Sequence, residues 1–425
     1  MKFACTVVLT ALWGCGSDNN VTDAQRPSGS VGVTQAGAQD AAQFRKLIED
    51  GRVPEPAVLD QVGFFAEHAL DQPAADCGDV VCAHPSLAVA PRFDDGTWTM
   101  AFVSLNSAVD PKTRPREPVH LVLAVETSAA AAGLTKTGTG MIEALLAELS
   151  PEDRLSVLSF GKEPKLLVSG AVPGETNVSD VALPGPGPVD EVDLYAGIAA
   201  ASQRTASLPH FVGSSRIVLL TTGKADSGIR DEARIVALTE SLVRQGVQFS
   251  VLGMGQSFDA SMPRAIAELG AGNYAFAEHG NDLQRLVLQE AGVRLLPLAR
   301  DVVLRVVPSA GYRVGRIYGA RRASVEDGAA VLRTPALFLG TRSSAMDTGQ
   351  GRRGGGGGLF VELVADPSTS SEIGADEPAF RLETSYHDVD AASDVSVEAE
   401  VNNDLRPGQR PSENWPHFSA PESGK

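Results

Sequence analysis

The chain is poor in cysteine, in histidine and in positive charge. Its 425 residues include 4 cysteines, 7 histidines and 36 Lys or Arg against 53 Asp or Glu, which gives a formal net charge of -17. Nucleic acids and anionic membranes both require basic patches, so this charge disfavours either as a partner. After the N-terminus no run approaches the roughly 20 apolar residues of a membrane-spanning helix. The sequence therefore predicts a protein that does not itself cross a bilayer.

Sequence motifs of hydrolytic enzymes are also missing. The chain contains neither His-Glu-x-x-His nor Gly-x-Ser-x-Gly, and its histidines are scattered along the sequence. No constellation of nucleophile, base and orienting group can be assembled from the sequence alone. A protein without enzymatic activity is predicted, with an exported enzyme of unfamiliar site as the last alternative.

The first fifteen residues have the pattern of an export signal. A positive start at Met1-Lys2 precedes a short apolar core, and Leu12-Trp13-Gly14-Cys15 resembles the lipobox of bacterial lipoproteins. The resemblance implies that Cys15 is lipidated and anchors the protein to the cell envelope. Gly16-Ser17 lacks the Asp of the inner-membrane retention signal, which favours the outer membrane where the host has one. An ordinary secretory signal with an incidental cysteine is the alternative.

Cys77 and Cys82 are the only cysteines left in the mature chain. Exported proteins meet oxidising conditions, so this closely spaced pair is predicted to form a structural disulfide. A zinc site would need two more ligands, and only His84 lies nearby. A redox pair more often has the spacing Cys-x-x-Cys.

Hydrophobic patterning divides the mature chain into four segments. Residues 16–41 are polar and predict a flexible tether. Residues 42–117 combine a helical pattern with alternating strands, and residues 293–425 again predict strands. Residues 118–292 alternate strand and helix, which is typical of a doubly wound, mostly parallel, Rossmann-like α/β sheet. Because such a sheet brings its ends close together, the flanking β-rich segments can pair into one β-sandwich.

Two strand-loop motifs connect this α/β segment to a family. Val119 to Val125 leads into Glu126-Thr127-Ser128-Ala129-Ala130, and Ile217 to Thr221 leads into Thr222-Gly223-Lys224. The segment resembles the von Willebrand factor A (VWA) domain family, whose first loop reads Asp-x-Ser-x-Ser and whose later loops add a Thr and an Asp to one Mg²⁺. The corresponding positions are Glu126, Ser128, Ala130, Val192 and Thr222.

These substitutions predict a degenerate metal site. Mg²⁺ requires near-octahedral oxygen coordination at about 2.0–2.1 Å, and neither Ala130 nor Val192 has a side-chain oxygen. Glu126 carries its carboxylate one methylene further out, a displacement of about 1.5 Å, and Thr222 offers a neutral hydroxyl. No metal or other cofactor is therefore predicted. The alternative is a rebuilt Mg²⁺ site of Glu126, Ser128, Asp193 and Asp226.

Function follows from the resemblance. VWA domains bind at the carboxyl ends of their strands, where open α/β sheets generally bind ligands. The loops at residues 126–130, 190–195 and 222–227 occupy this place. We predict a lipid-anchored, non-enzymatic protein-binding or scaffold protein, with a metal-dependent adhesin as the alternative.

Replacing Cys15 by Ala is expected to abolish lipid labelling and to release the protein from membrane fractions, because no other anchor is predicted. Metabolic labelling with a fatty acid, followed by fractionation at high salt, measures both effects. Continued sedimentation of the Cys15→Ala protein with membranes would contradict the lipobox assignment.

Overall fold

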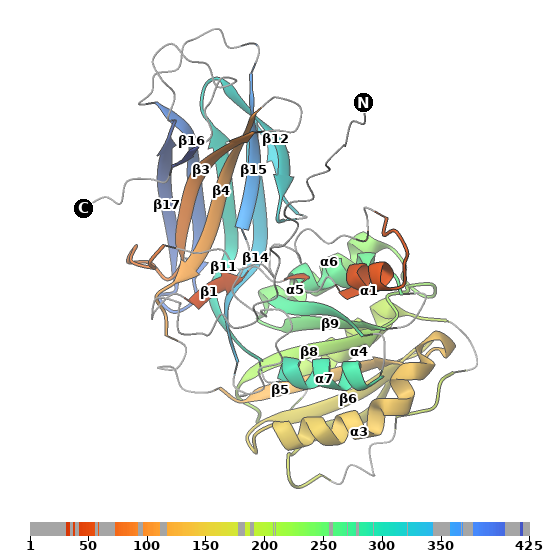
Figure 1. Ribbon diagram of the computed structural model, residues 1–425. Coiled ribbons are helices and arrows are strands. Elements are labelled where there is room, and N and C mark those ends of the chain that lie inside the picture. The colour runs from red at the N-terminus through yellow and green to blue at the C-terminus, as the bar shows by residue number, and fades with distance from the viewer. Residues whose placement is uncertain are drawn as a thin grey trace, which may run out of the picture.

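Hydrophobic strands between residues 118 and 292 form the centre of an α/β unit in the computed structural model, and a β-sandwich packs beside it (Figure 1). The structure describes residues 31–34, 37–38, 42–55, 58, 73–91, 97–110, 117–176, 183–187, 191–206, 208, 210–254, 258–269, 271–277, 280–291, 293–320, 322–342, 358–366, 368, 377–403 and 417–419. The predicted signal with Cys15, and residues 16–30 of the predicted tether, lie outside these ranges.

The sheet of the α/β unit has the order β2-β10-β9-β8-β5-β6-β7. Its strands are β2 (Gly37–Ala38), β5 (Val119–Glu126), β6 (Arg154–Phe160), β7 (Lys165–Ala171), β8 (Ser214–Thr221), β9 (Gln248–Met254) and β10 (Ala271–Ala277). All neighbours pair in parallel except β6 and β7, which are antiparallel. β5 is almost entirely buried because helices cover both of its faces, which explains its unbroken apolar run.

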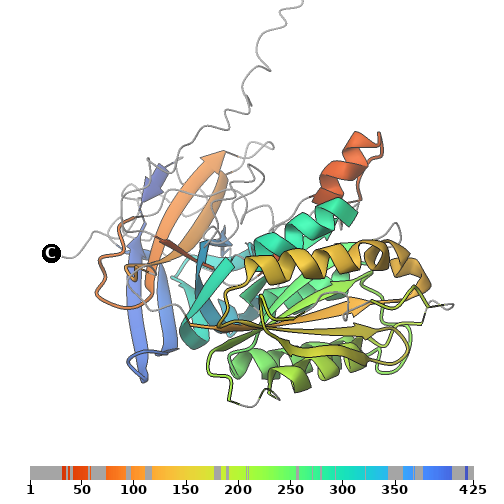
Figure 2. The same cartoon turned by 90° about the horizontal axis from the view of Figure 1, so that it is seen from below.

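Helices cover the sheet on both sides (Figure 2). One face carries α3 (Ala132–Glu148) and α7 (Gly280–Ala291), which share a core with Leu121 and Val125 of β5. The other carries α4 (Leu194–Thr205), α5 (Glu232–Arg244) and α6 (Ser261–Leu269), which pack on Val122 and Ala124. The doubly wound architecture predicted from the sequence is confirmed. Among the described residues, none of the helices is both long and apolar enough to span a bilayer.

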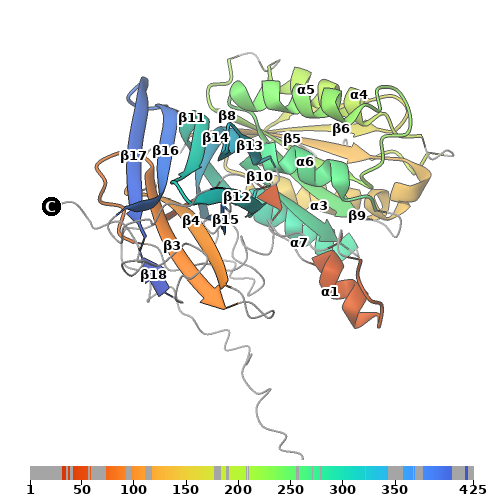
Figure 3. The same cartoon turned by 90° about the horizontal axis from the view of Figure 1, so that it is seen from above.

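Strands from before and after the α/β unit form the sandwich. Figures 1 and 3 show two layers. One layer contains β3 (Cys82–Pro91), β4 (Thr97–Ser107), β12 (Tyr312–Tyr318), β15 (Gly358–Ala365) and β18 (His417–Ser419). The other contains β11 (Val293–Pro308), β13 (Ser324–Glu326), β14 (Ala329–Arg342), β16 (Pro378–Asp388) and β17 (Ser393–Asn402). β4 pairs with β15 and one core joins both layers, so the flanking segments form a single β structure.

The N-terminal segment corrects the predicted tether at its C-terminal end. β1 (Val31–Thr34) pairs with both β4 and β14 and so links the two layers, while β2 extends the α/β sheet beside β10. Helix α1 (Ala42–Glu49) follows. A four-residue strand between two partners gains its stability from their backbone groups, which the composition of the segment does not reveal.

The two units share packed and charged contacts. Ala336 and Phe338 of β14 are buried in the core that α5 and α6 form over the sheet. Arg244 at the end of α5 lies 2.8 Å from Asp301 of β11, and Arg322 lies 3.2 Å from Glu240 of α5. The sandwich is therefore fixed against the α5 and α6 face of the sheet.

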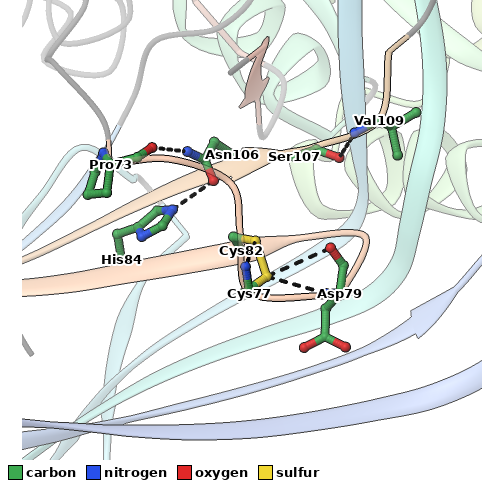
Figure 4. The surroundings of a disulfide bond; sticks show 8 residues. All are labelled: Pro73, Cys77, Asp79, Cys82, His84, Asn106, Ser107 and Val109. Atoms are coloured by element: carbon green, nitrogen blue, oxygen red, sulfur yellow. Dashed lines mark hydrogen bonds between the residues drawn. A yellow bond between two sulfur atoms is a disulfide. The ribbon is translucent and has the colours of Figure 1, made fainter. Parts of the chain in front are cut away.

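Cys77 and Cys82 form a disulfide at the start of β3, as Figure 4 shows. Asn106 of β4 holds the adjoining chain, because its amide donates to the carbonyl of Pro73 at 2.7 Å and its oxygen lies 2.7 Å from His84 Nε2. Val81, inside the closed loop, is buried in the sandwich core. The disulfide thus holds a loop that covers one end of that core.

Candidate functional site

Two of the loops predicted to form the site follow the carboxyl ends of β5 and β8, and the third precedes α4. Figure 2 shows these strand ends pointing away from the sandwich. After β5 the chain passes through Thr127 and Ser128 into a single 3-10 turn, Ala129–Ala131, and then into α3. This edge of the sheet is therefore free of the contacts that fix the two units to each other.

The carboxylate of Glu126 is completely buried at this edge and accepts four hydrogen bonds. Its Oε1 accepts from Ser128 Oγ at 2.5 Å and from Thr222 Oγ1 at 2.8 Å. Its Oε2 accepts from Thr221 Oγ1 and from the backbone N–H of Thr222, both at 2.7 Å. An ionised carboxylate has about four acceptor positions, so its hydrogen-bonding capacity is filled by protein donors.

The loop after β8 is built to present these donors. Gly223 N–H donates to Thr221 Oγ1 at 3.0 Å, and Asp259 N–H donates to the carbonyl of Thr222 at 3.1 Å. Gly223 has a φ of +82°, and a Cβ there would lie 1.9 Å from the carbonyl oxygen of Asp259. Glycine is required at this turn for both reasons. The Thr-Thr-Gly sequence therefore fixes two hydroxyls and one N–H against Glu126.

Val192 contributes backbone hydrogen bonds in place of a side-chain oxygen. Its side chain is buried in the core beneath α4, whereas its N–H donates to Asp226 Oδ1 at 2.6 Å. Its carbonyl accepts from the N–H groups of Asp226 and Ser227, each at 3.1 Å. The loops before α4 and after β8 are thus bonded to each other directly.

Asp193 and Asp226, the carboxylates of the alternative rebuilt site, each have a structural role. Asp193 caps α4 by accepting from the N–H of Ala196 at 2.8 Å, and Asp226 holds Val192. Glu126 and Ser128 bond to each other. The residues that the structure describes contain no cluster of three or more metal-ligating side chains. Asp190 lies outside those residues.

Mg²⁺ does not fit this arrangement. Ala130 is part of the 3-10 turn and has no ligand oxygen, and Val192 is directed into the core. Ser128 and Thr222 use their hydroxyl protons on Glu126, so a metal would have to displace both before reaching the carboxylate. Mg²⁺ releases its waters reluctantly and gains too few oxygens here to compensate.

Thr221 is the site residue that sequence reasoning missed. It was assigned to the strand, and its side chain is completely buried. Its hydroxyl donates to Glu126 Oε2 and accepts from Gly223 N–H. The sequence signal for this role was Glu126 in place of the family's shorter Asp, together with the adjacent pair Thr221-Thr222 at the end of the neighbouring strand. Together they supply an acceptor and enough donors to satisfy it.

His120, which begins β5, is buried far from these loops at the other end of the strand. Its Nε2 lies 2.8 Å from Ser156 Oγ, and its ring contacts Phe211 edge-on at 5.8 Å. Burial lowers the pKa of His120 to about 4, because the charged imidazolium loses its hydration. A histidine in this setting supports the sheet.

Comparison with known proteins agrees with this architecture. Residues 119–276 match the von Willebrand factor type A domain family. The α/β unit therefore contains a VWA-type domain over these residues.

Relatives are distant. The chain is 23% identical over 279 residues to the uncharacterized protein YfbK of Escherichia coli (strain K12), an alignment that covers 62% of this chain and 47% of that protein. The chain thus spans about half of its relative's length. One similar solved structure is a von Willebrand factor type A protein from Catenulispora acidiphila, with a TM-score of 0.45 and 14% identity, over 76% of this chain and 72% of that chain. Another is the ArnB paralog VWA2 from Sulfolobus acidocaldarius, with a TM-score of 0.41 and 14% identity, over 76% of this chain and 74% of that chain.

Replacing Glu126 by Gln is expected to lower the free energy of unfolding by about 3 kcal/mol, since the neutral amide keeps only one accepting oxygen and charge-assisted hydrogen bonds contribute about 1.5–3 kcal/mol each. Urea unfolding measures the change. Glu163→Gln, at an exposed carboxylate near the same edge, is the matched control and is expected to change stability by less than about 0.5 kcal/mol. Equal losses of unfolding free energy in both variants would show that the four hydrogen bonds to Glu126 do not stabilise the fold.

Proposed function

We propose that this protein is a non-enzymatic binding or scaffold protein of the bacterial cell envelope, anchored by a lipid on Cys15. Its VWA domain recognises a protein partner through the strand-end loops without a metal ion. The observation that carries the proposal is the buried Glu126 carboxylate, whose four acceptor positions are filled by Ser128, Thr221 and Thr222.

Internal hydrogen bonds take the place of a bound cation at this edge, since they stabilise a buried carboxylate and connect two loops. Three short hydrogen bonds, from Thr221 and Thr222 to Glu126, join the end of β5 to the end of β8. A fourth, from Ser128 to Glu126, closes within the loop after β5. Three more join the loop before α4 to the loop after β8 through Val192. The loops are therefore held in one conformation without a ligand, and such preorganisation lowers the entropic cost of binding a partner.

Exposed charges surround this rigid base. Lys162, after β6, pairs with Glu191 at 3.2 Å while both side chains remain largely exposed, and Asp226 is exposed after β8. An exposed pair of this kind contributes about 0–1 kcal/mol, so its members can exchange partners at little cost. These side chains suit a polar contact with another protein rather than the burial of a small ligand.

The anchor and the absence of catalysis rest on separate features. Cys15 precedes the first described strand by 16 residues, which can span about 50 Å when extended. The VWA domain could thus stand clear of the membrane surface. His120 supports the non-enzymatic assignment, because it is buried and its pKa is too low for a general base at neutral pH.

The melting temperature of the purified protein is expected to be the same with millimolar Mg²⁺, with Mn²⁺ and with EDTA. A ligand specific for the folded state adds about 2.7 kcal/mol at a hundredfold excess over its dissociation constant, which calorimetry would detect. An upward shift with Mg²⁺ that disappears in Glu126→Ala would overturn the metal-independent site and favour the adhesin.

A revertant provides the positive control for this measurement. Glu126→Asp with Ala130→Ser is expected to remain insensitive to Mg²⁺, since Val192 and Thr222 still withhold oxygens. Adding Val192→Thr and Thr222→Asp is expected to create a measurable site. Val192 is buried, so a threonine hydroxyl at this position lowers stability by about 1–3 kcal/mol if it lacks a hydrogen-bond partner. The melting temperature of each variant is therefore compared only between samples of that variant with and without metal.

Partner binding is tested by placing a photo-crosslinking amino acid at Asp226 in the producing bacterium. We expect a discrete crosslinked envelope protein, obtained equally with and without EDTA. Val212 is the control position, because it is 85% exposed but precedes β8 and so lies at the opposite end of the strand. Equal crosslinking from Val212, or loss of the Asp226 product in EDTA, would contradict the proposal.

A further inference from the structure

β17 ends the sandwich sheet with an open edge. Its ten residues pair with β16 on one side, and no strand among the described residues pairs with its other side. In Figure 2 the β16–β17 hairpin projects beyond the rest of the sandwich. Every second residue of such a strand directs an N–H and a carbonyl group outward, where they can pair with another chain.

This edge has neither a bulge between Phe380 and Asp388 of β16 nor a proline, two features that hinder pairing with any partner. The register with β16 is unbroken from Phe380 opposite Val401 to Asp388 opposite Ser393, and the strand contains neither proline nor lysine. The edge strand β12 at the other end of the sheet is shorter and has a register shift between Val314 and Ile317. Short or bulged edges resist strand addition, whereas long regular ones permit it.

The side chains of β17 specify what could pair with it. One face carries Val395, Val397 and Ala399, of which Val397 is 39% exposed. The other face carries exposed carboxylates at Asp394, Glu398 and Glu400, and the strand contains no cation. A strand added to this edge would therefore meet apolar side chains on one face and negative charge on the other.

Few basic side chains face this negative charge. Arg381 of β16 lies 2.6 Å from Glu383 and 3.8 Å from Glu398, and its pKa is raised chiefly by the hydrogen bond to Glu383. His387 lies 2.9 Å from Asp394. Arg305 also lies 3.8 Å from Glu383, so Glu383 is shared by two arginines whereas Glu398 has only the longer contact to Arg381. An incoming basic side chain would find partners on the strand.

We propose that β17 is a strand-addition site for an extended segment of a partner protein in which Lys or Arg alternates with β-branched apolar residues. Main-chain hydrogen bonds to the open edge would provide affinity. Opposite-charge pairs with Glu398 and Glu400, together with an apolar contact to Val397, would provide selectivity.

A second copy of this chain is a poorer occupant. Pairing two β17 strands would bring their carboxylates together, and like charges directly opposite each other destabilise a sheet. The net charge of -17 adds a general repulsion between copies. The acidic edge therefore resists self-association while it remains open to a basic segment.

This surface is distinct from the VWA loops. β17 belongs to the sandwich, whereas Glu126 and its neighbours lie at the far edge of the α/β sheet. A failure of partner binding at Asp226 would leave the β17 proposal unaffected, and the reverse is also true.

The probe is the synthetic peptide Lys-Val-Lys-Val-Lys-Val-Lys, added to the full chain. Hydrogen exchange is expected to slow at least tenfold at the outward amides of β17 and to remain unchanged in β12. The matched peptide with Glu in place of Lys is expected to have no effect. Glu398→Lys with Glu400→Lys is expected to weaken binding of the Lys peptide at least tenfold and to create binding of the Glu peptide.

Proline substitutions separate strand addition from simple charge attraction. Of the neighbours Ser396 and Val397, one directs its N–H toward β16 and the other outward. Ser396→Pro and Val397→Pro are therefore compared, and the variant that keeps the wild-type melting temperature is the one altered on the open side. It is expected to lose peptide protection.

Three outcomes would overturn the proposal. They are unchanged exchange in β17 when the Lys peptide is added, undiminished binding in the correctly folded proline variant, and concentration-dependent dimers of the wild-type chain that Glu398→Lys with Glu400→Lys abolishes.

Discussion

A buried carboxylate needs hydrogen-bond donors in place of its lost water, and at the end of β5 that requirement determines how the neighbouring loops are built. Glu126 obtains four donors from Ser128, Thr221 and Thr222, so the side chain that would belong to a metal site instead connects β5 to β8. The additional methylene of glutamate allows this, because it carries the oxygens toward the adjacent strand end. Gly223 completes the turn that presents the donors. The edge is consequently rigid on its own.

The second constraint is that both ends of the VWA domain are connected to the sandwich. The α/β sheet receives the chain from β4 and returns it to β11, and both strands belong to the sandwich, so the VWA domain is an insertion within the sandwich. Phe338 is buried within the core beneath α5 and α6, and Arg244 pairs with Asp301 across the junction. A domain inserted by both ends and packed in this way has less freedom than one attached by a single linker.

Much of the fold could be predicted because its signals are local. The apolar runs of β5 and β8 and the Asp residues that cap α4 and α5 are visible in short windows of sequence. β1 was missed because its four residues are stabilised by strands that are distant in the chain. At the site, the loss of ligand oxygens at Ala130 and Val192 was visible. The role of Thr221 was not, since it depends on the register that places β8 beside β5.

The arrangement supports a scaffold more readily than a simple adhesive surface. One proposed contact lies at the strand ends of the VWA domain and the other at β17, on different units that pack together through Ala336 and Phe338. Two sites on a rigid body fix the separation of their partners, and binding at one raises the effective concentration of anything linked to the partner at the other. Their chemistry also differs, since the loops at Lys162 and Asp226 present both charge signs whereas β17 presents carboxylates and free backbone groups. A partner suited to one surface is therefore poorly suited to the other, which allows both to be occupied at once.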